Sequence, residues 1–403
     1  MNTLVQIYRR LLAEVTPGYY RTFYRNFTMD HRFVGVVGAR GVGKTTFLLQ
    51  YLREQYGDGE KGLYISGDNL YFTEHTLVET ADQFVKLYGG ELLCIDEIHK
   101  YKNWNQELKN IYDSYPNLKI LFSGSSSIDL IKGKYDLSRR VILRQMYGFS
   151  FREFLEIQTG NTYPTMKLED ILDPSKHIDS EIGKTEKLLG YLHEYWQKGY
   201  YPTSQAIPVY EAFRDTLIGI IDKTIFEDIS TFYTLKTENL DTLKKIIYFF
   251  ATSLPGSVSI NKLANSLGKD HATITEYVQI LRDTGLLRFL LIDKYGHALV
   301  RNAEKIYLDN TNLLYAINNQ IGKEIHAGSV RELFVVSGLE NAGYPVLYSK
   351  TGDISCEGNI FEIGGANKTA TQIKDADKAY VVKDDILYAS ARTIPLYVFG
   401  FLS

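Results

Sequence analysis

The residues best suited to chemistry form a glycine-rich segment that ends in a lysine and two threonines. It follows a β-branched and aromatic run, Phe33–Val37, and reads Gly38-Ala39-Arg40-Gly41-Val42-Gly43-Lys44-Thr45-Thr46. A helical pattern continues to residue 55, so the segment lies between a strand and a helix. There, glycines let backbone N–H groups turn inward around phosphate oxygens at the positive end of the helix. We therefore predict a nucleotide phosphate site, in which Lys44 contacts the β- and γ-phosphates and the Thr45 hydroxyl coordinates Mg²⁺.

A pair of acids follows a second apolar segment. Residues 92–95 are apolar throughout, as in a central parallel strand, and they are followed by Asp96-Glu97. Two acids after a strand can also begin a solvated helix, but the phosphate-binding segment favours a catalytic reading. We assign Asp96 and Thr45 to the binding of Mg²⁺. We assign Glu97 and Lys44 to catalysis, in which Glu97 orients and deprotonates the attacking water.

Two further polar positions flank the expected fourth and fifth strands. Residues 119–122 lead into a serine-rich turn, where we prefer Ser125 as a contact to the γ-phosphate or to the attacking water. These serines could equally cap the next helix. Arg139 and Arg140 come just before the strand expected at residues 141–143, and an arginine here could act as a finger on a phosphate.

Composition limits the function further. A chain of 403 residues suggests two to four domains of roughly 100–200 residues each. The net charge of −3 excludes a strongly basic protein that coats nucleic acid through charge alone. The two cysteines, Cys94 and Cys356, match neither a disulfide framework nor a zinc pattern, and a reducing cytosol fits them best. There is no signal-peptide pattern and no apolar stretch near the ~20 residues of a membrane span, so we expect a cytoplasmic protein without membrane partners.

The chain resembles a family of predicted bacterial and archaeal AAA+ ATPases that carry a C-terminal domain of unknown function, related to nucleases of the PD-(D/E)XK kind. Beyond the glycine-rich segment, the resemblance rests on Ile95-Asp96-Glu97-Ile98-His99-Lys100 with Trp104, on Ser123-Gly124-Ser125-Ser126, on Phe149-Ser150-Phe151-Arg152-Glu153-Phe154-Leu155 and, more weakly, on Gly199-Tyr200-Tyr201-Pro202. It implies a P-loop α/β fold with strand order 5-1-4-3-2 and ATP as the nucleotide.

The resemblance also bears on the arginines. The family commonly has Leu-Ala-Gly-Arg where this chain has Leu137-Ser138-Arg139-Arg140, so the family's arginine falls on Arg140. Arg139 replaces the glycine, which leaves open which arginine acts, and a basic surface pair is the alternative. A finger supplied by a neighbouring copy requires self-association, which we keep as a hypothesis.

The expected domains are an AAA+ domain (1–150), a helical lid (151–234), a winged helix (235–300) and a nuclease-like α/β domain (301–403). The clearest amphipathic stretch of the lid spans residues 181–197. In the winged helix, helices at 240–253, 260–267 and 271–284 precede a β-ribbon that starts at residue 286.

The candidate recognition helix of the winged helix offers few basic side chains. Its exposed face is expected to carry Lys269, His271, Thr273 and Thr275, with Glu276 among them. Because phosphate contacts dominate affinity for DNA, the segment could serve DNA binding or protein docking.

The C-terminal domain has the acids of a nuclease without the expected lysine. Glu332, Asp353 and Glu362 follow one another in the order of PD-(D/E)XK nucleases, but Gly364 occupies the lysine position and the nearest basic residue is Lys368. We therefore expect a degenerate site, unless Lys368 supplies the missing charge.

Together these features predict an Mg²⁺-dependent ATP hydrolase that uses hydrolysis as a conformational switch on a protein or DNA partner. The alternative is a nucleotide-gated DNA- or protein-binding regulator with little turnover.

Overall fold

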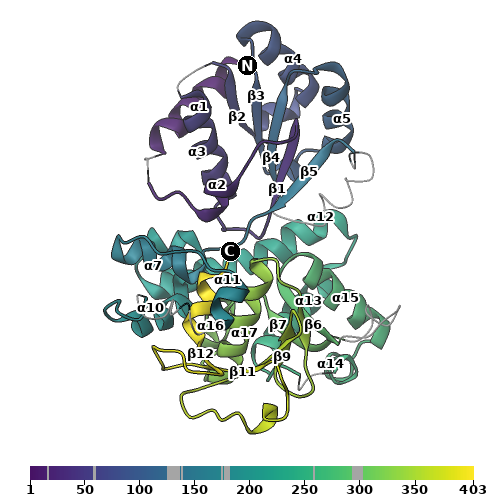
Figure 1. Ribbon diagram of the computed structural model, residues 1–403. Coiled ribbons are helices and arrows are strands. Elements are labelled where there is room, and N and C mark those ends of the chain that lie inside the picture. Colours follow the sequence, from purple (N-terminus) through teal and green to yellow (C-terminus); the bar gives the residue numbers. More distant parts are fainter. Residues whose placement is uncertain are drawn as a thin grey trace. The chain divides into compact units, whose positions relative to one another are not determined.

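The computed structural model (Figure 1) describes residues 1–15, 18–57, 60–124, 137, 139–173, 176, 182–256, 259–292 and 303–403. The chain divides into two units, Met1–Gly148 and Phe149–Ser403. Each unit buries apolar side chains of its own.

The first unit contains a five-stranded parallel sheet. Its strands are β1 (Phe33–Val37), β2 (Gly62–Ser66), β3 (Leu92–Asp96), β4 (Lys119–Gly124) and β5 (Val141–Gln145). They lie in the order β2-β3-β4-β1-β5, and every neighbouring pair is parallel. β1 and β3 are buried at every position, which explains their apolar sequences. The predicted strand order, 5-1-4-3-2, is confirmed.

Helices cover both faces of this sheet, with α1 and α3 on one side and α4 and α5 on the other (Figure 1). The helices of the unit are α1 (Asn2–Glu14), α2 (Thr22–Asn26), α3 (Lys44–Tyr56), α4 (Leu77–Tyr88) and α5 (Trp104–Ser114), with short 3-10 turns at Leu70–Thr73 and Ile98–Lys100. Thr76 and Glu79 form a capping box that begins α4. Because all neighbouring strands are parallel, their carboxyl ends meet at one edge of the sheet, between the two helical layers.

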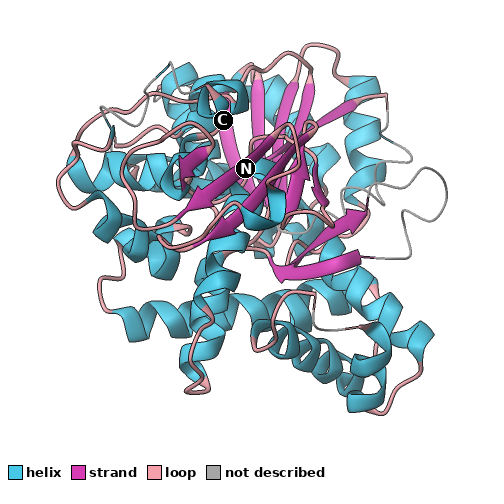
Figure 2. Ribbon diagram, turned by 60° about the horizontal axis from the view of Figure 1, so that its bottom comes forward, coloured by secondary structure: helices cyan, strands magenta, loops and turns pink. Residues whose placement is uncertain are grey.

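The second unit begins with helices and then alternates strands with helices, which Figure 2 colours magenta and cyan. Its helices are α7 (Phe151–Thr159), α8 (Leu168–Leu172), α10 (Leu188–Glu194), α11 (Tyr210–Lys223), α12 (Ser230–Phe232), α13 (Thr237–Ala251), α14 (Ile260–Leu267), α15 (His271–Asp283), α16 (Thr311–Gln320) and α17 (Ala327–Asn341). No helix among the described residues has the length and apolar character needed to cross a bilayer.

The helix expected over residues 181–197 is shorter and changes its winding. α10 begins only at Leu188, after Lys187 with φ 59°, and continues as a π-helix, Tyr195–Gly199. The Asn312 side chain donates to the carbonyls of Tyr195 (2.8 Å) and Trp196 (2.9 Å). A wide π turn frees backbone groups that need partners, and Asn312, far away in the sequence, supplies them.

A seven-stranded mixed sheet forms the rest of the second unit. Its strands are β6 (Leu287–Ile292), β7 (Ala303–Leu308), β8 (Val346–Tyr348), β9 (Ile354–Cys356), β10 (Asn359–Gly364), β11 (Ala379–Lys383) and β12 (Thr393–Pro395). Their order is β12-β11-β10-β9-β8-β6-β7, with β6 antiparallel to β7 and parallel to β8. The ribbon expected for the winged helix is therefore part of this larger sheet, and a boundary at residue 300 falls between two paired strands.

Candidate functional site

The glycine-rich segment forms a tight loop between β1 and α3. Gly41 and Gly43 have φ angles of 81° and 98°, in the left-handed region that favours glycine. A Cβ on Gly38 would lie only 2.1 Å from the carbonyl oxygen of Met146. The three glycines are thus required by backbone conformation or by close approach, as a loop that wraps phosphate oxygens requires.

Lys44 lies at the start of α3 and folds its side chain back over this loop. Its Nζ donates to the carbonyl oxygens of Gly38 (2.9 Å) and Ala39 (2.8 Å), and the residue is only 5% exposed. The ammonium is therefore held within the loop, close to where the helix dipole and the loop N–H groups favour an anion.

Asp96, at the end of β3, is held by hydrogen bonds from several elements. Oδ2 accepts from the hydroxyls of Thr45 (2.5 Å) and Tyr64 (2.8 Å), and Oδ1 accepts from the Ser123 hydroxyl and from the backbone N–H of Glu97 (3.1 Å). The two residues that the sequence assigns to Mg²⁺ are thus in direct contact. A hydroxyl and a carboxylate are suitable oxygen ligands for this ion, so the donor set fits it.

Glu97 has an unusual backbone conformation and an available carboxylate oxygen. Its φ and ψ are 47° and 41°, in the left-handed region that a non-glycine residue adopts only at a cost. Its Oε2 is buried and accepts no hydrogen bond from any described residue, although His99 Nε2 lies 3.4 Å away. A carboxylate with an unused acceptor beside a phosphate loop can take a proton from water.

Two residues at this centre were not assigned from the sequence, Tyr64 and Ser123. Tyr64 comes from β2, and burial together with the neighbouring Asp96 raises the pKa of its hydroxyl well above the ordinary value. Ser123 is fully buried, and its hydroxyl also accepts from the N–H of Glu97 (3.2 Å). Ser123 lies two residues before Ser125, the predicted contact to the γ-phosphate, and Ser125 lies outside the described residues.

The arginines lie at the other end of the sheet. Val141 pairs with Phe33, the first residue of β1, so Arg140 lies at the amino-terminal edge of the strands. Its guanidinium pairs with Asp113 (3.1 Å). Within one chain, the structure does not bring Arg140 to the phosphate loop. Arg140 could therefore act as an arginine finger only on the phosphate loop of a neighbouring copy.

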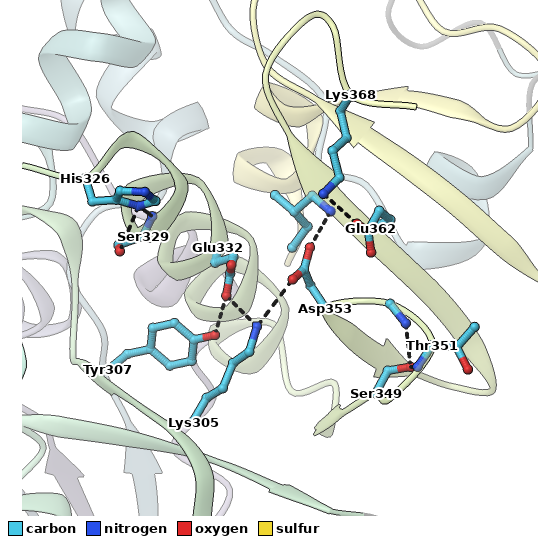
Figure 3. Close-up of polar contacts among 12 residues, drawn as sticks. Lys305, Tyr307, His326, Ser329, Glu332, Ser349, Thr351, Asp353, Glu362 and Lys368 are labelled. Atoms are coloured by element: carbon cyan, nitrogen blue, oxygen red, sulfur yellow. Dashed lines mark hydrogen bonds and ion pairs between the residues drawn. The ribbon is translucent and has the colours of Figure 1, made fainter. Parts of the chain in front are cut away.

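Two of the three predicted C-terminal acids contact one lysine, Lys305 (Figure 3). Lys305 Nζ lies between Glu332 Oε2 (2.8 Å) and Asp353 Oδ1 (3.3 Å), and the Tyr307 hydroxyl also donates to Glu332 (2.8 Å). Burial opposes the ammonium charge, but the two carboxylates outweigh it and raise the pKa of Lys305. Lys305 was not recognised from the sequence, because it lies far from the acids along the chain.

The third acid, Glu362, has its own cation. Lys368 Nζ lies 2.5 Å from Glu362 Oε1, so the displaced lysine does reach this acid (Figure 3). Glu362 is 2% exposed, and burial raises its pKa although Lys368 opposes the shift. Among the described residues, Glu332, Asp353 and Glu362 do not each bring an oxygen within 4.8 Å of the others.

Comparison with known proteins gives distant similarities over most of the chain. The chain is 26% identical over 385 residues to an uncharacterized protein of Methanocaldococcus jannaschii, MJ1637, covering 87% of this chain and 80% of that protein. The Walker-type ATPase PABY2304 of Pyrococcus abyssi shares 11% identity with a TM-score of 0.40, over 72% of this chain and 91% of that one. AMPPCP-bound DnaA of Aquifex aeolicus shares 14% identity with a TM-score of 0.27, over 70% and 88%.

Two family models match parts of the chain. Residues 189–324 match a domain of unknown function, DUF8612. Residues 30–155 match the AAA domain family AAA_14. This second match contains the phosphate loop, the Asp96-Glu97 pair and all five strands of the parallel sheet. The part of the chain that is similar to the AAA domain family is therefore the part that contains the predicted phosphate site.

Proposed function

We propose that the protein is an Mg²⁺-dependent ATP hydrolase that uses hydrolysis as a conformational switch on a protein or DNA partner. The observation that carries the proposal is the contact of Thr45 with Asp96 (2.5 Å). Beside it, Lys44 is held in the predicted phosphate loop, and Glu97 Oε2 accepts no hydrogen bond from the described residues. ATP is preferred over GTP because the family that the chain resembles uses ATP.

In this mechanism the loop N–H groups and Lys44 bind the β- and γ-phosphates. Mg²⁺, held by Thr45 and Asp96, would neutralise charge that develops on the phosphate oxygens. Glu97 orients a water and accepts its proton as the water oxygen bonds to the γ-phosphorus, while the bond from the γ-phosphorus to the bridging β-phosphate oxygen breaks and ADP leaves. Ser125 is the proposed contact that reports loss of the γ-phosphate, and Arg140 the proposed finger from a neighbouring copy. Two unpaired, buried cysteines fit the cytoplasmic setting expected from the sequence.

The test is steady-state ATP hydrolysis, with nucleotide binding measured separately, by wild type, Lys44→Ala and Glu97→Gln. Glu97→Gln should bind ATP but lose at least about a hundredfold in turnover, because the proton acceptor is removed. Lys44→Ala should lose nucleotide binding. Glu91→Gln is the matched control, since Glu91 is an exposed glutamate of the same unit, paired with Lys61.

The alternative is a regulator whose affinity for a partner changes with bound nucleotide while turnover is incidental. Glu97 Oε2, which accepts no hydrogen bond from the residues that the structure describes, favours catalysis. Tight ATP binding by wild type with no turnover, alone or with duplex DNA, would favour the regulator instead.

For the partner, we propose that the segment from α13 to β7 is a winged helix used in protein docking, with DNA binding as the alternative. The polar groups of its candidate recognition helix are engaged locally: Lys269 pairs with Glu238 (3.3 Å), and Thr273 donates to Asp270 (2.6 Å). Few cations thus face outward to meet phosphates. A gel shift that weakens steeply with salt would support DNA binding. It requires the whole chain, because the ribbon is part of a larger sheet.

We propose further that the C-terminal sheet has a nuclease-like fold without nuclease activity. The support is the Lys305 ammonium, which lies between two of the acids that would gather around a metal ion. An ammonium in this position neutralises the acids and competes with a divalent cation. DNA cleavage in Mg²⁺ or Mn²⁺ that disappears in Glu362→Ala would contradict this and would make Lys368 the functional lysine.

A further inference from the structure

Arg21, the residue before α2, donates hydrogen bonds to three backbone carbonyls. Nη1 donates to Val42 (2.8 Å) and Tyr147 (2.9 Å), and Nη2 donates to Gly148 (2.6 Å). Val42 belongs to the phosphate loop, whereas Tyr147 and Gly148 follow β5 and are the last residues of the first unit. One side chain therefore joins the nucleotide loop to the point where the chain leaves the AAA domain.

The segment that leaves the first unit, residues 146–148, also contacts the start of the phosphate loop. The Met146 N–H donates to the carbonyl of Val37 (2.7 Å), and the Met146 carbonyl approaches Gly38 so closely that no side chain fits between them. Residues 146–148 thus run alongside the loop, with backbone contact at its start and Arg21 bridging to its middle.

Immediately after Gly148, the chain is fixed within the second unit. The Phe149 N–H donates to the carbonyl of Tyr200 (2.7 Å), and its own carbonyl accepts from the Tyr195 hydroxyl (2.7 Å). The next residue, Ser150, caps α7 in a capping box with Glu153. Residues 147 and 148 therefore directly precede a hydrogen-bonded part of the second unit.

We propose that Arg21 is the positioning residue that couples nucleotide in the phosphate loop to the exit segment, residues 146–148. The inference rests on the proposed function, because it needs a nucleotide that moves the loop. Binding phosphate shifts Val42, and the planar guanidinium shifts with it because it is bonded on both sides. A guanidinium presents several N–H donors in a fixed plane, which a lysine ammonium does not reproduce.

Hydrogen exchange of the whole chain, with and without Mg²⁺ and a non-hydrolysable ATP analogue, tests the coupling. The readouts are peptides over residues 38–46 and 144–152, compared in wild type, Arg21→Ala, Arg21→Lys and Arg32→Ala. Arg32 is the matched control, because it also donates to two backbone carbonyls of the first unit, Tyr112 (2.9 Å) and Tyr115 (2.7 Å), away from the loop.

We expect nucleotide to slow exchange in both peptides of wild type and of Arg32→Ala. Arg21→Ala should bind nucleotide and protect residues 38–46 but no longer residues 144–152. Its kcat should fall by about tenfold, with a smaller change in KM, because misplacement of the loop affects the reacting geometry more than binding. Arg21→Lys keeps the charge and should restore less than half of the protection, and it replaces Arg21→Ala if that variant does not fold.

Two outcomes would overturn the coupling and leave the proposed ATP hydrolase intact. In the first, both Arg21 variants still show nucleotide-dependent protection of residues 144–152. In the second, nucleotide protects residues 38–46 of wild type but not residues 144–152. No nucleotide binding by wild type would overturn the proposed function, and this inference with it.

Discussion

Replacing Tyr64 with phenylalanine removes one hydroxyl from the Asp96 carboxylate and leaves the ring in place. Tyr64 is 6% exposed, and its hydroxyl shares Asp96 Oδ2 with the Thr45 hydroxyl, at 2.8 and 2.5 Å. Because burial and Asp96 raise the pKa of Tyr64 well above its ordinary value, the hydroxyl remains a donor at any pH the fold tolerates. The effect of the substitution should therefore not depend on pH between 6 and about 9.

The magnitude follows from the type of bond. A hydrogen bond to a charged acceptor contributes about 1.5–3 kcal/mol, so we expect the free energy of unfolding to fall by about 2 kcal/mol. Partners that orient a metal ligand typically change metal affinity or activity by about 10- to 100-fold when removed. We therefore expect about a tenfold rise in the Mg²⁺ concentration that gives half-maximal ATP hydrolysis.

The assays are urea unfolding in EDTA and a Mg²⁺ titration of hydrolysis at constant ATP. Tyr101→Phe is the control, because it deletes a hydroxyl bonded to another carboxylate of the same unit, Glu107 (2.7 Å). The control should lose stability without any change in Mg²⁺ dependence. If Tyr64→Phe and Tyr101→Phe give the same Mg²⁺ dependence, the argument that Tyr64 orients a metal ligand is refuted.

Three further substitutions or reactions have outcomes that the structure predicts. Gly38→Ala should abolish nucleotide binding, measured with a fluorescent analogue, because the added Cβ would lie 2.1 Å from the Met146 carbonyl. Cys94 and Cys356 should resist alkylation at pH 8 in the native protein and react in urea, measured by mass spectrometry, because both are buried and burial raises the pKa of the Cys356 thiol to about 12. Lys305→Met should lower the free energy of unfolding by about 3 kcal/mol, because it leaves the Glu332 and Asp353 carboxylates without the cation that they share. An unchanged midpoint of urea denaturation would contradict this.

Much of the first unit could be predicted because its signals are local. The predicted phosphate loop is a continuous segment whose glycines are required by the conformation of a few consecutive residues, because Gly41 and Gly43 have φ angles in the left-handed region. The parallel strands are buried on both faces, so their apolar runs identified them directly. Their order came from the resemblance to a family, not from the pattern of any strand.

What surrounds these segments was decided by the tertiary structure. Tyr64, Ser123 and Arg21 reach the site from other parts of the chain, and no spacing along the sequence distinguishes them from core or surface residues of the same types. For a related reason, the sequence did not predict that the winged-helix ribbon belongs to the seven-stranded sheet. β6 has a free edge that its own sequence cannot pair, and β8, more than fifty residues away, supplies the hydrogen bonds.

The C-terminal acids also show which features the sequence predicts and which only the tertiary structure decides. Their order and the missing lysine were visible in the sequence, but the cations that neutralise them were not: Lys368 returns to Glu362, and Lys305 lies between the other two acids. The sequence by itself therefore determined the glycine-rich loop and the strands beside it, because local conformation requires the glycines and burial requires the apolar residues. Only the tertiary structure decided which distant side chains hold them, because the energy of a hydrogen bond or ion pair depends on proximity in space.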